Sequence, residues 1–261
     1  MIRSYTSNTT GKDYICSDIH GHFSLLTQQL EQINFDEQTD RLFSLGDLID
    51  RGDESDQALK WLAKPWFFAI QGNHERMLIN AYESRSESLW FQWMMWGGSW
   101  AEDMDFNALE PFYRAFSQLP LAIELALPNG KSVGLVHAEL PDVCDWDDIK
   151  QLLSNIEPNQ IEATLATSDM LWGKIQPYLP IDEILRIELV QNIDHVFHGH
   201  TIVESYRTIT NRTFMDLGSY ESGRIGLLDP VLFLDDCDHS HQIKSTGCFD
   251  RFLRNQLCAL L

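Results

Sequence analysis

Three short apolar runs, each followed at once by a polar turn, constrain the fold of this chain more than any other feature. The runs at 13–17, 41–45 and 66–71 have the length and the aromatic or β-branched content of buried strands. Apolar residues at helical spacing fill the two intervals between them, with Phe23, Leu26, Leu30 and Ile33 in the first and Ala58, Leu59 and Leu62 in the second. This alternation predicts a largely parallel sheet covered by helices.

The rest of the chain continues as an α/β protein after an aromatic-rich middle. Segment 86–117 contains Trp90, Trp93, Trp96 and Trp100, and we expect it to form helices that pack against or cap the remainder. Further strands are predicted at 121–127, 132–136, 195–197, 213–217 and 224–228, and helices at 147–153 and 183–190. Because the sequence has no internal repeat and no long Pro/Gly/Ser linker, one domain over 1–261 is expected, with its motifs between about 13 and 228.

Charge and composition exclude several functional classes. The 261 residues include 39 acidic and 19 basic side chains, a net charge of −20, so binding to nucleic acid or to anionic membranes is not expected. The sequence lacks an apolar run of about 18 residues and an apolar leader, which argues against a membrane span and a signal peptide. Five cysteines without a CxxC pair favour a reducing, cytoplasmic location.

Metal-binding side chains follow five of the predicted strands. The segments are SDIHG at 17–21, GDLIDRG at 46–52, GNHE at 72–75, His137 after an apolar run, and HGHT at 198–201. A single Asp or His in a turn usually bonds to the loop or caps a helix. Strand ends of an open α/β sheet, however, converge on one crevice, so the recurrence favours a shared site.

The chemistry of these side chains indicates the kind of metal. Carboxylate, imidazole and amide groups suit Mn²⁺, Fe or Zn²⁺, and without clustered thiolates a closed structural zinc site is not expected. Six ligands exceed the need of one ion that must also bind water and substrate. Two ions bridged by one carboxylate fit the set better.

In this order, the motifs DxHG, GDxxDRG and GNHE, with two later histidines, resemble the metal-dependent phosphoprotein phosphatase family. The likeness looks closest to small bacterial and phage-type serine/threonine protein phosphatases within the calcineurin-like metallophosphoesterase superfamily. It implies a β-sandwich of mixed sheets flanked by helices, with the active site at the carboxyl ends of strands.

The resemblance also implies a set of metal ligands in this sequence. Asp18 and His20 would hold the first ion, Asp47 would bridge both, and the second ion would be held by Asn73, His137 and His200. The family pattern selects His200 over His198, but His198 lies two residues away on the same side of an extended chain. It therefore stays open as an alternative ligand.

The expected chemistry is attack on phosphorus by a hydroxide that bridges the two ions and has a lowered pKa. His74 is expected to protonate the leaving group, and the resemblance implies that Asp50 orients it. Arg51 is suited to bind two phosphate oxygens, and Asn73 and Lys174 are further candidates for phosphate binding.

The roles of two further basic residues do not follow directly from the family pattern. Lys174 follows Leu171-Trp172-Gly173, where small bacterial members often have an arginine, and a lysine lacks the planar fork. Arg76 follows the GNHE block directly, and a solvated helix face is the expected position for it.

The sequence therefore predicts hydrolysis of phosphoserine and phosphothreonine in proteins or peptides, with phosphotyrosine open. One alternative is a symmetrical diadenosine tetraphosphate hydrolase, although Asp50 and Glu75 favour the protein phosphatase. The other is a non-catalytic scaffold, which retention of all six ligands disfavours. The native metal, with Mn²⁺ expected, the physiological substrate and the oligomeric state stay open.

Overall fold

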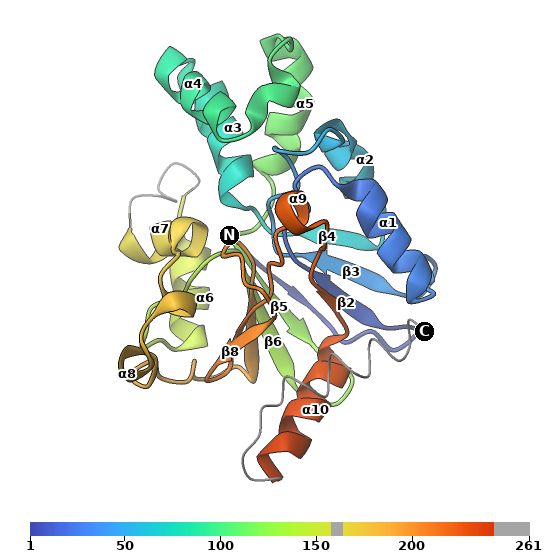
Figure 1. Cartoon of the computed structure of the whole chain (residues 1–261), viewed down its shortest axis with the longest axis vertical. Helices are drawn as coiled ribbons and strands as arrows, with labels where there is room; N and C mark the ends of the chain where they lie inside the picture. Colours follow the sequence, from blue (N-terminus) through green and yellow to red (C-terminus); the bar gives the residue numbers. More distant parts are fainter. Residues whose placement is uncertain (158–163, 243–261) are drawn as a thin grey trace.

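The computed structural model describes residues 1–157 and 164–242, and Cys248 and Cys258 lie outside them. Two sheets pack face to face with helices outside (Figure 1). The four-stranded sheet has the order β10-β2-β3-β4, and the six-stranded sheet has the order β1-β5-β6-β7-β9-β8. This confirms the α/β fold with mixed sheets.

The four-stranded sheet carries the first three motifs. Its strands are β10 (Leu227–Leu228), β2 (Asp13–Cys16), β3 (Arg41–Ser44) and β4 (Phe67–Ala69). The strands β2, β3 and β4 are parallel, while β10 pairs antiparallel with β2. The three motif-bearing turns therefore leave the sheet at one edge, as the strand pattern predicted.

The six-stranded sheet carries the two later histidine segments. Its strands are β1 (Ile2–Tyr5), β5 (Ala122–Ala126), β6 (Ser132–Val136), β7 (His195–His198), β9 (Arg212–Phe214) and β8 (Arg207–Ile209). The pairs β1–β5, β6–β7 and β7–β9 are parallel, and β5–β6 and β8–β9 are antiparallel. Because β6 and β7 are parallel neighbours, His137 and His200 leave the sheet at the same edge.

Alternation along each strand divides its side chains between two apolar layers. Ile15 points between the sheets, where it shares a core with Phe43 and with Leu135 of the opposite sheet. Tyr14 and Cys16 point outward to α1 (Phe23–Gln32) and α2 (Ala58–Leu62). A third cluster lies under α6 (Trp146–Asn155) and α7 (Leu165–Trp172) on the outer face of the six-stranded sheet.

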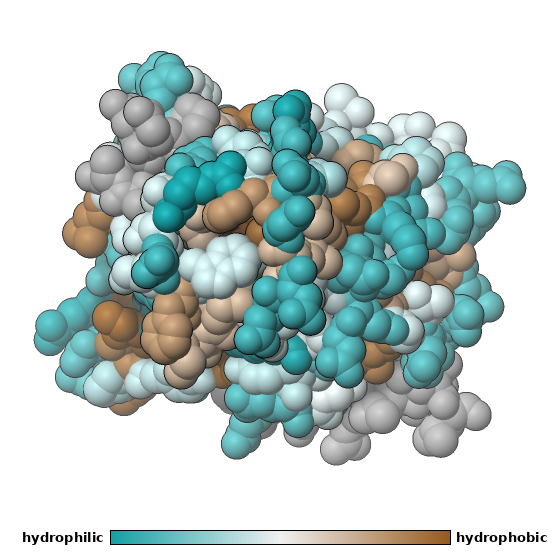
Figure 2. All heavy atoms as spheres, turned by 90° about the horizontal axis from the view of Figure 1, so that it is seen from above, coloured by the Kyte–Doolittle hydropathy of each residue, from teal (hydrophilic) through white to brown (hydrophobic). Residues whose placement is uncertain are grey.

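A group of helices over residues 73–116, the helical cap, stands at one end of the molecule (Figure 1). It comprises α3 (Asn73–Ser84), α4 (Glu87–Met95), the 3₁₀ turn η2 (Gly98–Ala101) and α5 (Phe106–Phe116), which confirms the helices predicted in the aromatic-rich segment. The core under α1 and α2 continues into it through Trp93 and Phe116. Viewed onto this end, apolar side chains lie among polar ones at the surface (Figure 2), and Phe91 and Met95 of α4 are exposed.

The observed elements differ from the predicted ones at several places, since β8, α7 and α10 (Pro230–Gln242) were not predicted and β9 and β10 are shorter than the strands expected there. The predicted helix at 183–190 is wrong beyond α8 (Ile181–Ile184), because the following backbone bonds to other segments: Glu188 N–H donates to the Asp142 carbonyl and Val190 N–H to the Asn211 side chain. Edge strand β1 was not predicted, since its exposed Arg3 and Ser4 weaken the apolar signal. Of the described helices, none has the length and apolarity needed to cross a membrane.

The other described elements are three short ones, η1 (Ser55–Gln57), η4 (Gln176–Tyr178) and α9 (Ser219–Ser222), and the 13-residue helix α10. Residues 235–238, with the acidic sequence DDCD, belong to α10, at the end of the molecule opposite the helical cap (Figure 1).

Candidate active site

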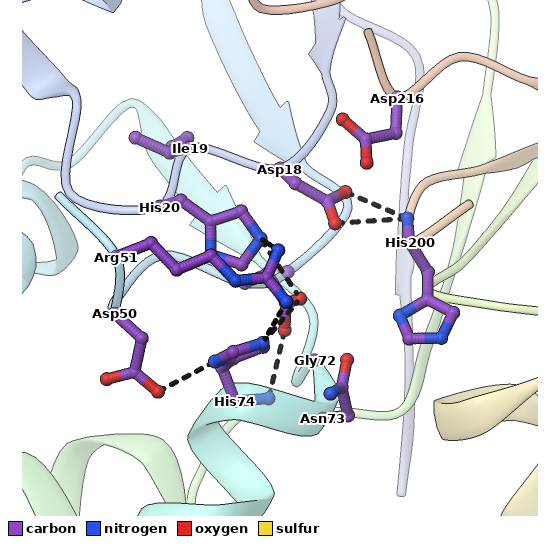
Figure 3. A network of polar contacts seen from close by, with 12 residues as sticks. Asp18, Ile19, His20, Asp50, Arg51, Gly72, Asn73, His74, His200 and Asp216 are labelled. Atoms are coloured by element: carbon purple, nitrogen blue, oxygen red, sulfur yellow. Dashed lines mark hydrogen bonds and ion pairs between the residues drawn. The ribbon is translucent and has the colours of Figure 1, made fainter. Parts of the chain in front are cut away.

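The polar turns after five strands converge on one buried site (Figure 3). Asp18 and His20 follow β2, Asp47 follows β3, and Asn73 begins α3 just after β4. His137 follows β6 and His200 follows β7. Every one of these side chains is buried, with at most 7% of its surface exposed. Residues that are far apart in the sequence thus form a single polar cluster.

Asp47 joins two groups of possible metal ligands. Its Oδ2 lies 3.6 Å from His20 Nε2 and 3.8 Å from His74 Nε2, and its Oδ1 lies 3.5 Å from His137 Nε2. The second group also contains His200. Each carboxylate oxygen therefore faces a different group, as a bridging ligand requires.

Hydrogen bonds set the ring nitrogen that each histidine presents. His20 Nδ1 lies 3.0 Å from the Ile49 carbonyl and His137 Nδ1 lies 2.7 Å from the Leu45 carbonyl. A nitrogen that donates to a carbonyl carries the proton, so Nε2 of both rings is left with its lone pair. Burial lowers the pKa of both rings, although Asp47 opposes the shift.

Asn73 and His200 complete the second group. The Oδ1 atom of Asn73 lies 2.9 Å from His137 Nε2, and Nδ1 of His200 lies 3.1 Å from the same nitrogen. His198, the alternative ligand, turns away: its Nδ1 lies 2.6 Å from the Ala138 carbonyl and its ring stacks on Phe214. The structure therefore brings His200, and not His198, to Asp47.

Asp18 is buried beside the two groups without belonging to either one. Both of its oxygens lie 3.0 Å from the backbone N of His200, which donates to them. Burial, together with the charges of Asp216 and Asp47, raises the pKa of Asp18. Asp216 was missed by the sequence reasoning, although it follows β9 as the other acidic residues follow their strands. Burial raises the pKa of Asp216 to about 7.

Glu75 fixes the second turn against the third. Its carboxylate accepts hydrogen bonds from the backbone N–H groups of Asp47, Leu48 and Gly72, at 3.0, 2.8 and 2.8 Å. Burial and the charge of Asp47 raise its pKa to about 8, while the N–H donors oppose the shift. These bonds form a clamp that holds the backbone of Asp47 and Leu48 against Gly72.

The backbone at the site is unusual. Positive φ angles occur at His20 (46°), Asp47 (47°), Asp50 (73°), Arg51 (71°) and His200 (61°). Such angles cost energy in residues other than glycine and persist where the surrounding structure imposes them. The surrounding structure therefore holds the backbone of the site in these conformations.

His74 and Asp50 form a buried pair. His74 Nδ1 lies 2.7 Å from Asp50 Oδ2, and burial lowers the pKa of His74 less than Asp47 and Asp50 raise it, so the net shift is upward. The indole N–H groups of Trp93 and Trp100 also donate to Asp50. Sequence reasoning predicted the His74–Asp50 pair but missed the two indoles.

Arg51 reaches across the site toward both rings. Its Nη1 lies 2.9 Å from His20 Nε2 and its Nη2 lies 3.0 Å from His74 Nε2 (Figure 3). The guanidinium carbon lies 4.2 Å from the centre of the Tyr220 ring, a cation–π contact that the sequence did not indicate. A planar donor group is thus held above the candidate ligands.

The two other basic candidates differ in position. Lys174 is exposed. Burial is the largest cause of the lowered pKa of His137 and His200, and the positive charge of Lys174 lowers both pKa values further. Arg76 was expected on a solvated face, which is wrong: only 5% of it is exposed and it donates to Gln71. The first turn of α3 is covered by the rest of the chain, so this position faces inward.

The donor set fits a pair of divalent ions. Carboxylate, imidazole and amide groups converge, and Asp47 is shared. Nε2 of His200 is buried and has no hydrogen-bond partner among the described residues. Buried polar atoms normally have a partner, so an unpaired nitrogen beside these ligands is consistent with a site that binds a further group.

Comparisons with known proteins identify relatives of this chain. Residues 14–204 match the family described as calcineurin-like phosphoesterase. Serine/threonine-protein phosphatase 2 of Salmonella typhimurium is 34% identical over 215 residues, which are 81% of this chain and 89% of that protein. The symmetrical bis(5'-nucleosyl)-tetraphosphatase of Marinomonas sp. is 26% identical over 149 residues, 55% of this chain and 50% of that protein.

A solved protein serine/threonine phosphatase from Saccharomyces cerevisiae shares the fold, with a TM-score of 0.58 at 19% identity over 82% of this chain and 70% of that one. Since the family match spans more than half of the sequence, the chain belongs to the calcineurin-like phosphoesterase family.

Proposed function

We propose that this protein is a metal-dependent phosphoprotein phosphatase that hydrolyses phosphoserine and phosphothreonine monoesters. The observation that carries the proposal is the His74–Asp50 pair, 2.7 Å apart, beside two ligand groups that share Asp47. The bacterial relative that covers most of the chain is named a serine/threonine-protein phosphatase. These features favour cleavage of a single phosphate ester with an alkoxide leaving group.

We assign six residues as ligands of two divalent ions, with Mn²⁺ as the expected metal. Asp18 and His20 would hold the first ion, Asp47 would bridge, and Asn73, His137 and His200 would hold the second. When bound, such ions activate water as a nucleophile and stabilise the negative charge of the phosphoryl group.

Side chains of the protein would bind the phosphate and supply the proton. Arg51 has two terminal nitrogens near the ligands and can bind two phosphate oxygens in place of the rings it now contacts. His74 donates through Nδ1 to Asp50, so its Nε2 faces the site. In the imidazolium form, which carries a second proton on Nε2, it can deliver that proton to the departing oxygen once Arg51 has turned to the phosphate. Lys174, exposed beside the second group, adds positive charge for an incoming anion.

Symmetrical dinucleoside tetraphosphate hydrolysis is the second candidate, because a relative with that name matches half of this chain. The two functions differ in the leaving group. A serine alkoxide needs a proton when it departs, whereas a nucleotide phosphate departs as a stabilised anion. A buried acid held by Asp50 is therefore more useful in the first reaction.

A substrate panel tests the proposal. The Mn²⁺-loaded protein is assayed on phosphoserine, phosphothreonine and phosphotyrosine peptides and on diadenosine tetraphosphate. We expect the highest kcat/KM on a phosphoserine or phosphothreonine peptide. A preference for the dinucleotide would replace it with the second candidate, and no hydrolysis of any ester by the folded, metal-loaded chain would favour a scaffold role.

A further inference from the structure

We propose that Trp93 and Trp100 are positioning residues that hold the Asp50 carboxylate toward His74 through their indole N–H groups. This inference rests on the proposed function for its catalytic consequence. Nε1 of Trp93 lies 3.1 and 2.9 Å from the two oxygens of Asp50, and Nε1 of Trp100 lies 2.7 Å from Oδ1. The two indoles come from α4 and η2 of the helical cap.

Each oxygen of the Asp50 carboxylate accepts hydrogen bonds from two donors. Oδ1 of Asp50 accepts from both indoles, while Oδ2 accepts from Trp93 and from His74 Nδ1 at 2.7 Å. Donors on both oxygens fix the rotation of the carboxylate about its Cβ–Cγ bond. Oδ2 is thereby aimed at the imidazole.

Neutral donors suit this position for an electrostatic reason. Asp50 and His74 are both fully buried, with 0% of each side chain exposed. A buried carboxylate needs hydrogen bonds to offset the loss of water. A lysine or arginine would supply them but would also compete with His74 for the negative charge. Indole N–H groups satisfy the carboxylate and add no positive charge, so its field acts on His74.

Packing holds the two indoles in place. Trp93 is fully buried and makes edge contacts with Trp90 and Trp100, at ring-centre distances of 5.2 and 6.2 Å. A side chain at Gly98 would place Cβ 2.8 Å from Nε1 of Trp93, so the glycine permits the close approach. The Trp-rich segment therefore has a local role beyond general core packing.

Substitution by phenylalanine removes the N–H group and keeps a ring. In Trp100→Phe and Trp93→Phe we expect kcat on a phosphoserine peptide to fall roughly 10-fold, with KM changed less than about 2-fold, as loss of one bond to a charged group predicts. On p-nitrophenyl phosphate, whose leaving group needs little protonation, kcat should change less. Trp90→Phe is the matched control, since Trp90 packs on Trp93 and has no bond to Asp50.

The His74→Asn background separates positioning from general damage. If the indoles act through His74, adding Trp100→Phe to His74→Asn should lower kcat no further. An equal 10-fold loss in both backgrounds, or an equal loss on both substrates, would overturn the inference.

A measurement on the metal-free chain tests the indole–Asp50 hydrogen bonds without an activity assay. The indole N–H signals of Trp93 and Trp100 are assigned in ¹H–¹⁵N spectra from the two phenylalanine variants. In Asp50→Asn both should move upfield, because an amide oxygen is a weaker acceptor than a carboxylate, and the Trp90 signal should stay. Unmoved signals would refute the hydrogen bonds. Shifted signals together with no phosphopeptide hydrolysis would overturn the proposed function and the catalytic role, but not the indole–Asp50 contacts.

Discussion

Oδ2 of Asp50 lies 2.7 Å from Nδ1 of His74, and this bond fixes the imidazole so that its Nε2 faces the ligand groups. The same Nε2 lies 3.0 Å from Nη2 of Arg51 and 3.8 Å from Oδ2 of Asp47. His74 therefore occupies a position where it can act as an acid or bind an ion. Burial lowers the pKa of His74 less than Asp47 and Asp50 raise it, and this net rise favours the acid.

His74→Asn distinguishes the two roles. We expect kcat on a phosphoserine peptide to fall roughly 100- to 10,000-fold, since a positioned acid contributes that much. The loss on p-nitrophenyl phosphate should be smaller, and the metal content should be unchanged. Loss of an ion from the purified variant would make His74 a ligand instead. His195→Gln, at the start of β7, serves as a control for replacing a buried histidine.

Asp47→Asn tests the bridge. The carboxylate places one oxygen toward each ligand group, and an amide offers one acceptor oxygen and no charge. We expect the affinity for both ions to fall by roughly 100-fold or more, together with turnover. Metal content is measured by mass spectrometry after dialysis. Asp13→Asn, at the opposite end of β2 and paired with Arg41, should keep both ions; two retained ions in Asp47→Asn would exclude a bridge.

Glu75→Gln tests the clamp between the second and third turns. One glutamine oxygen cannot replace a carboxylate that accepts from three separate backbone N–H groups, and the amide NH₂ would face donors. The free energy of unfolding should fall by about 2–4 kcal/mol, measured with urea on the metal-free chain. Glu83→Gln on the same helix, where Glu83 is exposed and accepts from Tyr113, should change it by less than about 1 kcal/mol. Equal effects would contradict the clamp.

His195 predicts a dependence of stability on pH. Burial, helped by Lys131, lowers its pKa to about 3. In the unfolded chain the pKa is about 6.5, so below that pH the unfolded state takes up a proton that the folded state refuses. Stability from this residue is therefore lost as the pH falls from about 6.5 toward 3.

Between pH 6.5 and 5 that loss amounts to roughly 2 kcal/mol for one proton. His195→Gln should remove that much of the decline, as followed by urea unfolding at both pH values. An unchanged slope in the variant would mean that His195 is protonated in the folded state.

Strand ends could be predicted from the sequence because apolar runs and polar turns are local signals. The same rule would have found Asp216 after β9, but a single acidic residue without a second motif residue did not stand out. The bonds from Glu75 to the backbone of Asp47 and Leu48, and the indole bonds to Asp50, join residues 27 to 50 positions apart. Local patterns carry no record of such contacts.

Tertiary contacts also explain the incorrect expectations. Segment 185–190 has helical spacing, but the N–H groups of Glu188 and Val190 bond to Asp142 and Asn211 instead of to the preceding turn. Arg76 is polar, yet it lies buried against Gln71. The positive φ angles at the site could not be predicted from the sequence either, since they belong to the turns around Asp47. The sequence thus indicated which residues meet, and not how the backbone holds them.

Titration of the metal-free chain with Mn²⁺, with hydrolysis of a phosphoserine peptide followed in the same samples, tests the central claim most directly. We predict that calorimetry finds two ions per chain and that hydrolysis reaches its maximum only when both are bound. Hydrolysis by the metal-free chain, or full activity with one ion per chain, would contradict the account.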